Sequence, residues 1–92
     1  MHDGVRARGI GRLDGSELKM VTIDAGGSLS AHRHAHPHLV LVLDGAGTVS
    51  DAGGAHRIGP DAVVMVASDE LHSFGAATRQ PLRFVCLDGA RE

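Results

Sequence analysis

Short apolar runs alternate along the chain with glycine, proline and aspartate, and no window of useful length has a helical period. Residues 39–43 are five consecutive Leu and Val residues closed by Asp44-Gly45, and residues 63–66 are a second apolar run, of three Val residues and one Met. Runs of four to seven residues that are rich in β-branched side chains and bounded by turn residues are typical of strands. Because they recur at intervals of about ten residues, the pattern predicts an all-β sandwich or barrel.

The pattern also predicts where each strand and turn lies. Gly26-Gly27 is expected to be a turn, and Asp44-Gly45 to close a strand whose return partner begins at Thr48. The first residues are rich in glycine and arginine, so 1–16 are expected to be a flexible arm or a weak edge strand, followed by a β-barrel domain over 17–92. The expected strands are 18–24, 28–34, 39–43, 48–50, 56–58, 63–66, 71–76 and 82–87.

The size and composition of the chain exclude some classes of function. With 92 residues the chain is long enough for one domain and buries only about 60–65% of its unfolded surface, so a metal or a partner subunit is a plausible source of stability. The net charge is −2, and the sequence has no Trp or Tyr and only two Phe, which argues against nucleic-acid binding. The one cysteine, the short apolar runs and the lack of a signal-peptide pattern predict a cytoplasmic protein without a membrane partner.

Histidine is the unusual residue: there are seven, of which four lie between positions 32 and 38. His32 and His34 are two residues apart, so in a strand both imidazoles point to one face. His38 follows a loop that contains Pro37, and His72 begins a later apolar strand. Histidines delivered by separate strand ends predict a built pocket, and imidazole suits Zn, Fe, Ni and Cu.

The stretch from Gly26 to Gly45 resembles the first motif of the cupin family. Five residues separate Gly26 from His32, one separates His32 from His34, three separate His34 from His38, and six lie before Gly45. Most cupins have glutamate where this chain has His38, and the replacement resembles the small cupins whose metal site is all histidine.

The second cupin motif is matched more loosely, by Asp61, Ala67, Asp69, His72 and Ala76. Of the motif residues only the metal-ligating histidine, His72, is kept. Aspartate tolerates the left-handed turn conformations that glycine serves in the family. The resemblance spans residues 18–87 and implies a single-domain cupin barrel, a double-stranded β-helix or jelly roll, with one divalent transition metal (Mn, Fe, Cu, Ni or Zn) bound by His32, His34, His38 and His72.

Such a site is compatible with several functions. Four neutral imidazoles leave the full metal charge, which favours an anionic ligand, and an octahedral shell has two further positions, whereas a tetrahedral zinc shell has none. We expect a metalloenzyme, first an oxidoreductase of the dioxygenase type that acts on a small enolisable or keto-acid-like compound, or else a lyase or isomerase. The alternatives are a free-standing small-molecule sensor and a structural domain stabilised by metal.

Candidates for lining the pocket are Met20, His36, Phe74, Phe84 and Cys86. Each has a second interpretation: solvent exposure for His36 and core packing for the others. Asp69-Glu70 is expected to form a turn rather than an acid–base pair. The alternating Leu39, Leu41 and Leu43 offer apolar side chains to a partner, so we also expect a homodimer.

Overall fold

The computed structural model describes residues 2–33 and 35–89, without the side chain of His2. Within these ranges the chain consists of strands and turns, which confirms the all-β prediction, and it contains no helix of the length and apolarity needed to cross a membrane. The strands are β1 (His2–Leu13), β2 (Ser16–His32), β3 (His38–Gly45), β4 (Gly47–Asp51), β5 (Gly54–Ile58), β6 (Val63–Val66), β7 (His72–Ala76) and β8 (Leu82–Asp88).

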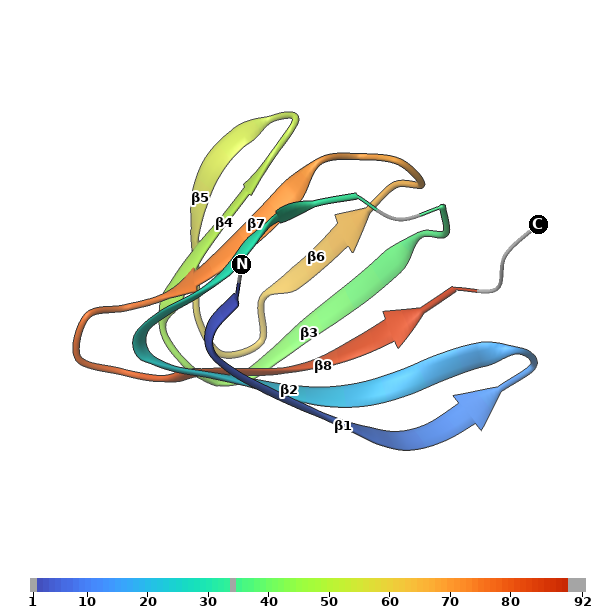
Figure 1. Ribbon diagram of the computed structural model, residues 1–92, viewed down its shortest axis with the longest axis horizontal. Coiled ribbons are helices and arrows are strands. Elements are labelled where there is room, and N and C mark those ends of the chain that lie inside the picture. Colours follow the sequence, from blue (N-terminus) through green and yellow to red (C-terminus); the bar gives the residue numbers. More distant parts are fainter. Residues whose placement is uncertain (1, 34, 90–92) are drawn as a thin grey trace.

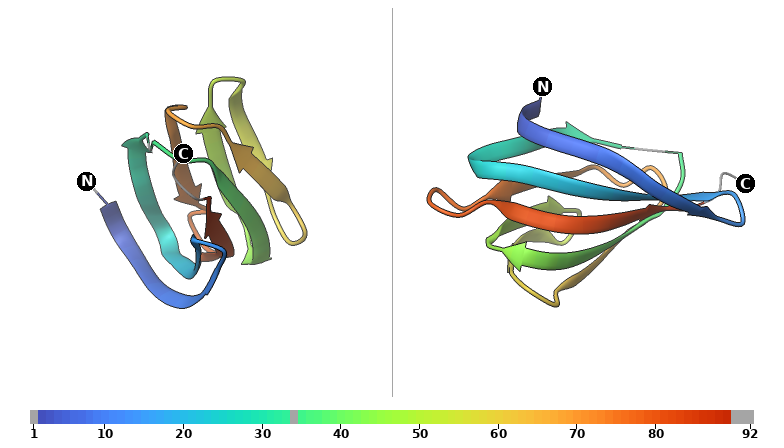
Figure 2. Two further views of the ribbon diagram at one scale, coloured as in Figure 1. Left: turned by 90° about the vertical axis from the view of Figure 1, so that its right-hand side faces the viewer. Right: turned by 90° about the horizontal axis from the view of Figure 1, so that it is seen from below.

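All pairings are antiparallel, and the strands follow the order β5-β4-β7-β2-β8-β3-β6 in one sheet that curls around its core (Figure 1). The first strand, β1, lies in the range for which an arm or an edge strand was expected, and it pairs with β2 along most of its length. Figure 2 shows the curl from the side and from below, with β1 beside β2. The core includes Val49 and Phe74 from one half of the curl and Val40 and Phe84 from the other.

The predicted turn at Gly26-Gly27 is wrong, because β2 continues through these residues as one bent strand. Residues 17–23 pair with β8, whereas residues 28–32 pair with β7. Gly26 has a φ of 74°, and a Cβ on Gly27 would lie 2.5 Å from the carbonyl oxygen of Asp3. The two glycines therefore allow a bend and a close backbone approach, so that β2 joins both halves of the sheet.

The predicted return strand after Asp44-Gly45 is also wrong. β3 pairs with β6 and β8, while β4 pairs with β5 and β7, so the two strands are not partners. Gly45 has a φ of 91° and lies opposite Leu82, where the Pro81 carbonyl occupies the place of a side chain. The chain thus crosses at this point from one half of the curl to the other.

The segment that resembles the second cupin motif has aspartate at two positions where that motif has glycine, and both residues take the left-handed conformation. Asp61 has a φ of 71° and Asp69 a φ of 63°. The Glu70 carboxylate accepts hydrogen bonds from the backbone N–H groups of Ala52 and Ala67, at 3.2 and 3.0 Å. The structure therefore confirms the turn predicted at Asp69-Glu70.

Replacing Gly45 with alanine should destabilise the fold by about 2 kcal/mol or more, since a side chain there meets both an unfavourable φ and the Pro81 carbonyl. Gly11→Ala is the matched control, because a Cβ at Gly11 has no described atom within 4 Å. Urea denaturation measures the stability of both variants. Equal midpoints for the two variants would contradict this account of the crossing.

A candidate metal site at three strand ends

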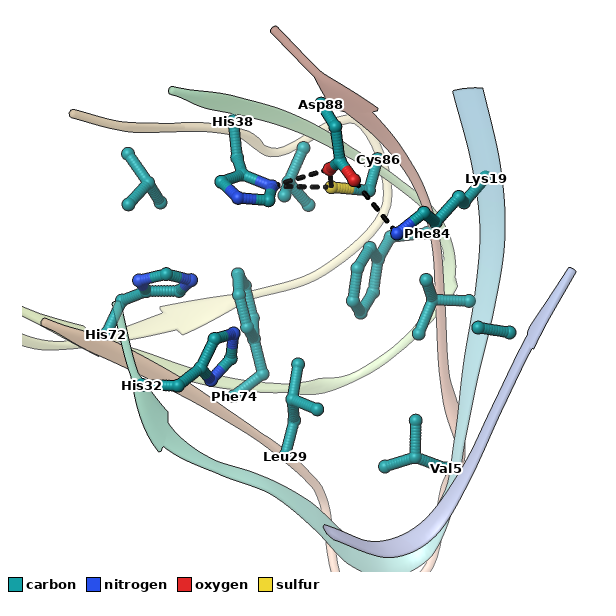
Figure 3. Close-up of a pocket in the computed structure, with 14 residues that line it drawn as sticks. Val5, Lys19, Leu29, His32, His38, His72, Phe74, Phe84, Cys86 and Asp88 are labelled. Atoms are coloured by element: carbon teal, nitrogen blue, oxygen red, sulfur yellow. Dashed lines mark hydrogen bonds and ion pairs between the residues drawn. The ribbon is translucent and has the colours of Figure 1, made fainter. Parts of the chain in front are cut away.

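Three described histidines meet where three strands end or begin (Figure 3). His32 ends β2, His38 begins β3 and His72 begins β7. His32 and His72 lie directly opposite each other in the β2–β7 pairing, with ring centroids 4.3 Å apart, and the His38 ring lies 5.7 Å from that of His72. His34 lies outside the described residues, so the structure brings together three of the four predicted ligands.

Backbone carbonyls fix two of these rings. The His32 Nδ1–H group donates to the Ser30 carbonyl at 2.6 Å, and the His72 Nδ1–H group donates to the Glu70 carbonyl at 2.9 Å. A carbonyl oxygen only accepts, so Nδ1 carries the proton and Nε2 carries the lone pair of each neutral ring. Metal-binding histidines are commonly held by this same hydrogen bond.

The third ring is fixed by a carboxylate. His38 Nδ1–H donates to Asp88 Oδ1 at 2.6 Å, and the Cys86 thiol donates to the same oxygen at 3.2 Å. Lys19 Nζ lies 2.9 Å from the other oxygen, Oδ2. His38 and Asp88 are nearly buried, with side chains 8% and 11% exposed.

Sequence reasoning missed Asp88 and Lys19. Lys19 lies on the inner face of β2, in the same register as the buried Val21 and Ile23. Asp88 continues the buried series of Phe84 and Cys86 on β8. An ionic residue in the inward register of an apolar strand is the signal that could have identified both.

The charges of this cluster are set by its hydrogen bonds and its burial. Burial alone would raise the pKa of Asp88, but hydrogen bonds from Lys19 and Cys86 lower it below its ordinary value. The hydrogen bond to Asp88 raises the pKa of Lys19. Burial, aided by the same carboxylate, raises the pKa of the Cys86 thiol to about 12. Near neutral pH the cluster therefore contains an ammonium, a carboxylate and a neutral thiol.

Burial lowers the pKa values of His38 and His72 below the ordinary histidine value, against the opposing effects of Asp88 and of the Glu70 carbonyl. Both rings are therefore neutral at pH 7. Neutral imidazole is the form that binds a metal.

A second donor group shares His38. Ligand atoms of His36, His38 and Asp88 all lie within 4.8 Å of one another, and the His36 ring lies 5.1 Å from the His38 ring. This group would offer a metal two imidazoles and one carboxylate. The described residues thus hold two candidate donor sets that share His38: this group, whose ligand atoms lie within 4.8 Å of one another, and the three histidines at the strand ends.

A cavity of about 250 Å³ adjoins the three histidines. Phe74 and Phe84 form part of its wall, with their rings stacked 5.1 Å apart, and Cys86 also lines it. Met20 does not line the cavity, because its side chain points to the outer face of β2, and His36 faces a separate hollow beside Arg12. Among the predicted lining residues, Phe74, Phe84 and Cys86 therefore line the same cavity as the three histidines.

Residues 19–88 match the family described as the Cupin domain, and the chain belongs to that family. A curated relative, 1-methylthio-D-xylulose 5-phosphate methylsulfurylase of Rhodospirillum rubrum, is 28% identical over 74 residues, which are 80% of this chain and 47% of the relative. The chain thus spans about half the length of this relative.

Solved structures agree with the fold. A cupin-2 domain from Rhodospirillum rubrum superimposes with a TM-score of 0.89 at 23% identity, over 99% of this chain and 64% of that chain. A cupin 2 conserved barrel domain protein from Rhodopseudomonas palustris gives the same TM-score, 0.89, and 23% identity, over 99% of this chain and 65% of that one. At this level of identity the likeness establishes the cupin barrel.

The metal-free protein should lose stability as the pH falls through about 6.5, the ordinary histidine pKa. A histidine whose pKa is lowered by folding binds its proton more readily in the unfolded chain, so acid favours unfolding until the pH is below the folded value. Denaturant midpoints between pH 8 and pH 5.5, measured with a chelator present, test this.

The variant His72→Gln provides the comparison. It should flatten the pH dependence, because it removes a buried histidine whose pKa is lowered by burial. An identical pH dependence in wild type and His72→Gln would contradict the assignment of a buried neutral His72.

Proposed function

We propose that this cupin is a metalloenzyme that holds one divalent transition metal through Nε2 of His32, His38 and His72, with His34 as the fourth ligand. Its substrate is a small enolisable or keto-acid-like compound that binds the metal. The observation that carries the proposal is the common Nδ1 anchoring of the three described rings, which assigns the lone pair of each to Nε2. A fixed tautomer is what a histidine ligand requires.

The bound metal would polarise a substrate carbonyl and, with a redox-active ion, supply electrons for reaction with O₂. The chain contributes the surroundings. Phe74 and Phe84 exclude water from one side of the cavity, which strengthens electrostatic attraction within it. Neutral ligands leave the metal charge uncompensated, so the site favours a compound with an enolate or carboxylate oxygen.

The protonation states favour chemistry centred on the metal. Among the described side chains that line the cavity, the ionisable groups other than histidine are Lys19, Cys86 and Asp88. Each has its pKa shifted away from neutrality, so none is suited to exchange protons at pH 7. A dioxygenase reaction needs little acid–base assistance, so we propose first that the protein is an oxidoreductase of the dioxygenase type.

A second candidate is a lyase or sulfur-transfer reaction that needs no O₂. The relative from Rhodospirillum rubrum supports it, because its name specifies a methylthio ketose phosphate as its substrate. A ketose has an enolisable carbonyl group, so both candidates share one substrate class.

Removing either His38 or His72 should weaken metal binding by more than the roughly 10–100-fold that loss of an outer hydrogen-bond partner costs. Elemental analysis and chelator competition compare His38→Ala and His72→Ala with His56→Ala, an exposed histidine away from the cavity. About one equivalent of metal in wild type and His56→Ala, and little in the other two, is the expected result. Full retention in His72→Ala would contradict the site.

Paired assays separate the two reactions on the metal-loaded protein. O₂ uptake with a β-diketone or an α-keto acid supports the dioxygenase. Anaerobic exchange of substrate α-protons with D₂O, or thiol release from an α-methylthio ketone, supports the second candidate. Saturable binding without any turnover would instead identify a sensor or a carrier.

We also propose that the protein forms a homodimer through the outer faces of β2, β3, β6 and β8. Val63 and Met65 are 60% and 77% exposed there, beside leucines of β3 that are each about 40% exposed. Antiparallel sheets usually turn a polar face to water, so an apolar outer face indicates that another molecule covers it. The outer patch is Leu18, Met20, Leu39, Leu41, Leu43, Val63, Met65, Val85 and Leu87.

Charge supports a second copy of this chain as the occupant. Arg8 lies opposite Met20 and so borders the outer patch on the β1 side, beside Arg6, which already pairs with Asp24 at 2.8 Å. On the other side, the turns that flank β6 carry Asp61 and Asp69. A twofold axis parallel to the strands places the arginine side of one copy over the aspartate side of the other, and closes the assembly as a dimer.

Leu41→Asp should therefore convert the dimer to a monomer, because it places a charge at the centre of the outer patch. Leu71→Asp is the matched control, since Leu71 is a 48% exposed leucine outside the patch. Light scattering after size-exclusion chromatography measures the mass of each. A wild-type monomer at all concentrations, or a Leu41→Asp dimer, would refute this interface.

A further inference from the structure

Lys19 and Asp88 form an ion pair that faces the interior of an otherwise apolar and histidine-lined cavity. Lys19 comes from β2 and Asp88 from the neighbouring β8, and both residues also line the hollow that contains His36. Figure 3 shows Asp88 between His38 and Lys19, with His72 and His32 across the cavity from Lys19. The Lys19 side chain is 36% exposed, whereas the Asp88 side chain is only 11% exposed, so the desolvation cost falls on the carboxylate.

The carboxylate is held on both sides. Asp88 Oδ1 accepts from His38 Nδ1 at 2.6 Å and from Cys86 Sγ at 3.2 Å, while Oδ2 accepts from Lys19 Nζ at 2.9 Å. A carboxylate with both oxygens engaged has little freedom to rotate. The ring that donates to it is therefore fixed in orientation as well as in tautomer.

We propose that Asp88 is the positioning residue of the metal site: it turns His38 so that Nε2 faces His72 and His32, and Lys19 holds Asp88 in the orientation that does so. The proposal rests on the proposed function of this site. His32 and His72 are anchored by neutral carbonyls, whereas His38 is anchored by a carboxylate. A charge-assisted hydrogen bond is stronger and makes the opposite ring nitrogen more basic, so His38 is the strongest donor of the three.

The same geometry argues against Asp88 as a direct ligand. A metal held by His36, His38 and Asp88 would have to compete with the donors that already occupy this carboxylate, since Oδ1 accepts from His38 and Cys86 and Oδ2 accepts from Lys19. It would also lie close to the Lys19 ammonium, and the repulsion between a dication and an ammonium at such a distance is large in a partly buried site. Asp88 therefore acts on the metal through His38.

The positioning role of Asp88 is tested by the affinity of the full chain for Co²⁺ and Zn²⁺, measured by chelator competition. Asp88→Asn keeps the shape of the side chain and should weaken binding about 10–100-fold without abolishing it. Lys19→Met should weaken it less, and His36→Ala should leave it unchanged. The visible spectrum of bound Co²⁺ should change in Asp88→Asn and stay as in wild type in His36→Ala.

Proton NMR of the metal-free protein provides an independent readout. The His38 Nδ1–H proton, identified by its absence in His38→Gln, should be strongly deshielded in wild type and in His36→Ala and should disappear or move upfield in Asp88→Asn. A structural role alone would alter unfolding without moving this signal or the Co²⁺ spectrum.

Two results would overturn the positioning role alone: unchanged metal affinity in Asp88→Asn, or a loss in His36→Ala as severe as in Asp88→Asn, which would make Asp88 a ligand beside His36. A wild-type protein that binds no metal would overturn the proposed function and this role with it.

Discussion

The bent strand β2 is the constraint on which the rest of the structure depends. Its first half pairs with β8 and its second half with β7, so a single strand sets the register of both halves of the curl. The second half places His32 opposite His72, and the first half places Lys19 beside the strand that ends in Asp88. Because the register of β2 is fixed along both halves, the backbone positions both the histidine cluster and the Lys19–Asp88 ion pair. The bend at Gly26-Gly27 sets how these two groups lie relative to each other.

Much of this arrangement could be predicted from the sequence. The strands follow from apolar runs, and His32, His38 and His72 were placed at strand ends by the same pattern. What escaped prediction depends on neighbours distant in sequence. Gly26-Gly27 and Asp44-Gly45 have the composition of turns, but pairing with β7, β8 and Pro81 makes them a bend and a crossing. Local propensity cannot reveal which strand a residue will face.

Side-chain direction explains the other differences. Met20 was a candidate for the cavity, but its place in β2 puts it on the outer face, one position from the inward Lys19. The inner face of this strand carries a charge, which runs against the usual apolar pattern, and its partner Asp88 lies 69 positions later in the chain. A departure from the pattern of this kind marks a functional site more often than an error in the strand assignment.

The central claim is that the metal lies among imidazoles on the cavity side of His38. X-ray absorption spectroscopy of the protein loaded with one equivalent of Zn²⁺ tests it directly, because imidazole rings give multiple-scattering features that carboxylates lack. The account predicts a shell of nitrogen atoms with scattering from at least three imidazoles. A shell of two imidazoles and a carboxylate oxygen would place the metal with His36, His38 and Asp88 and would contradict the account.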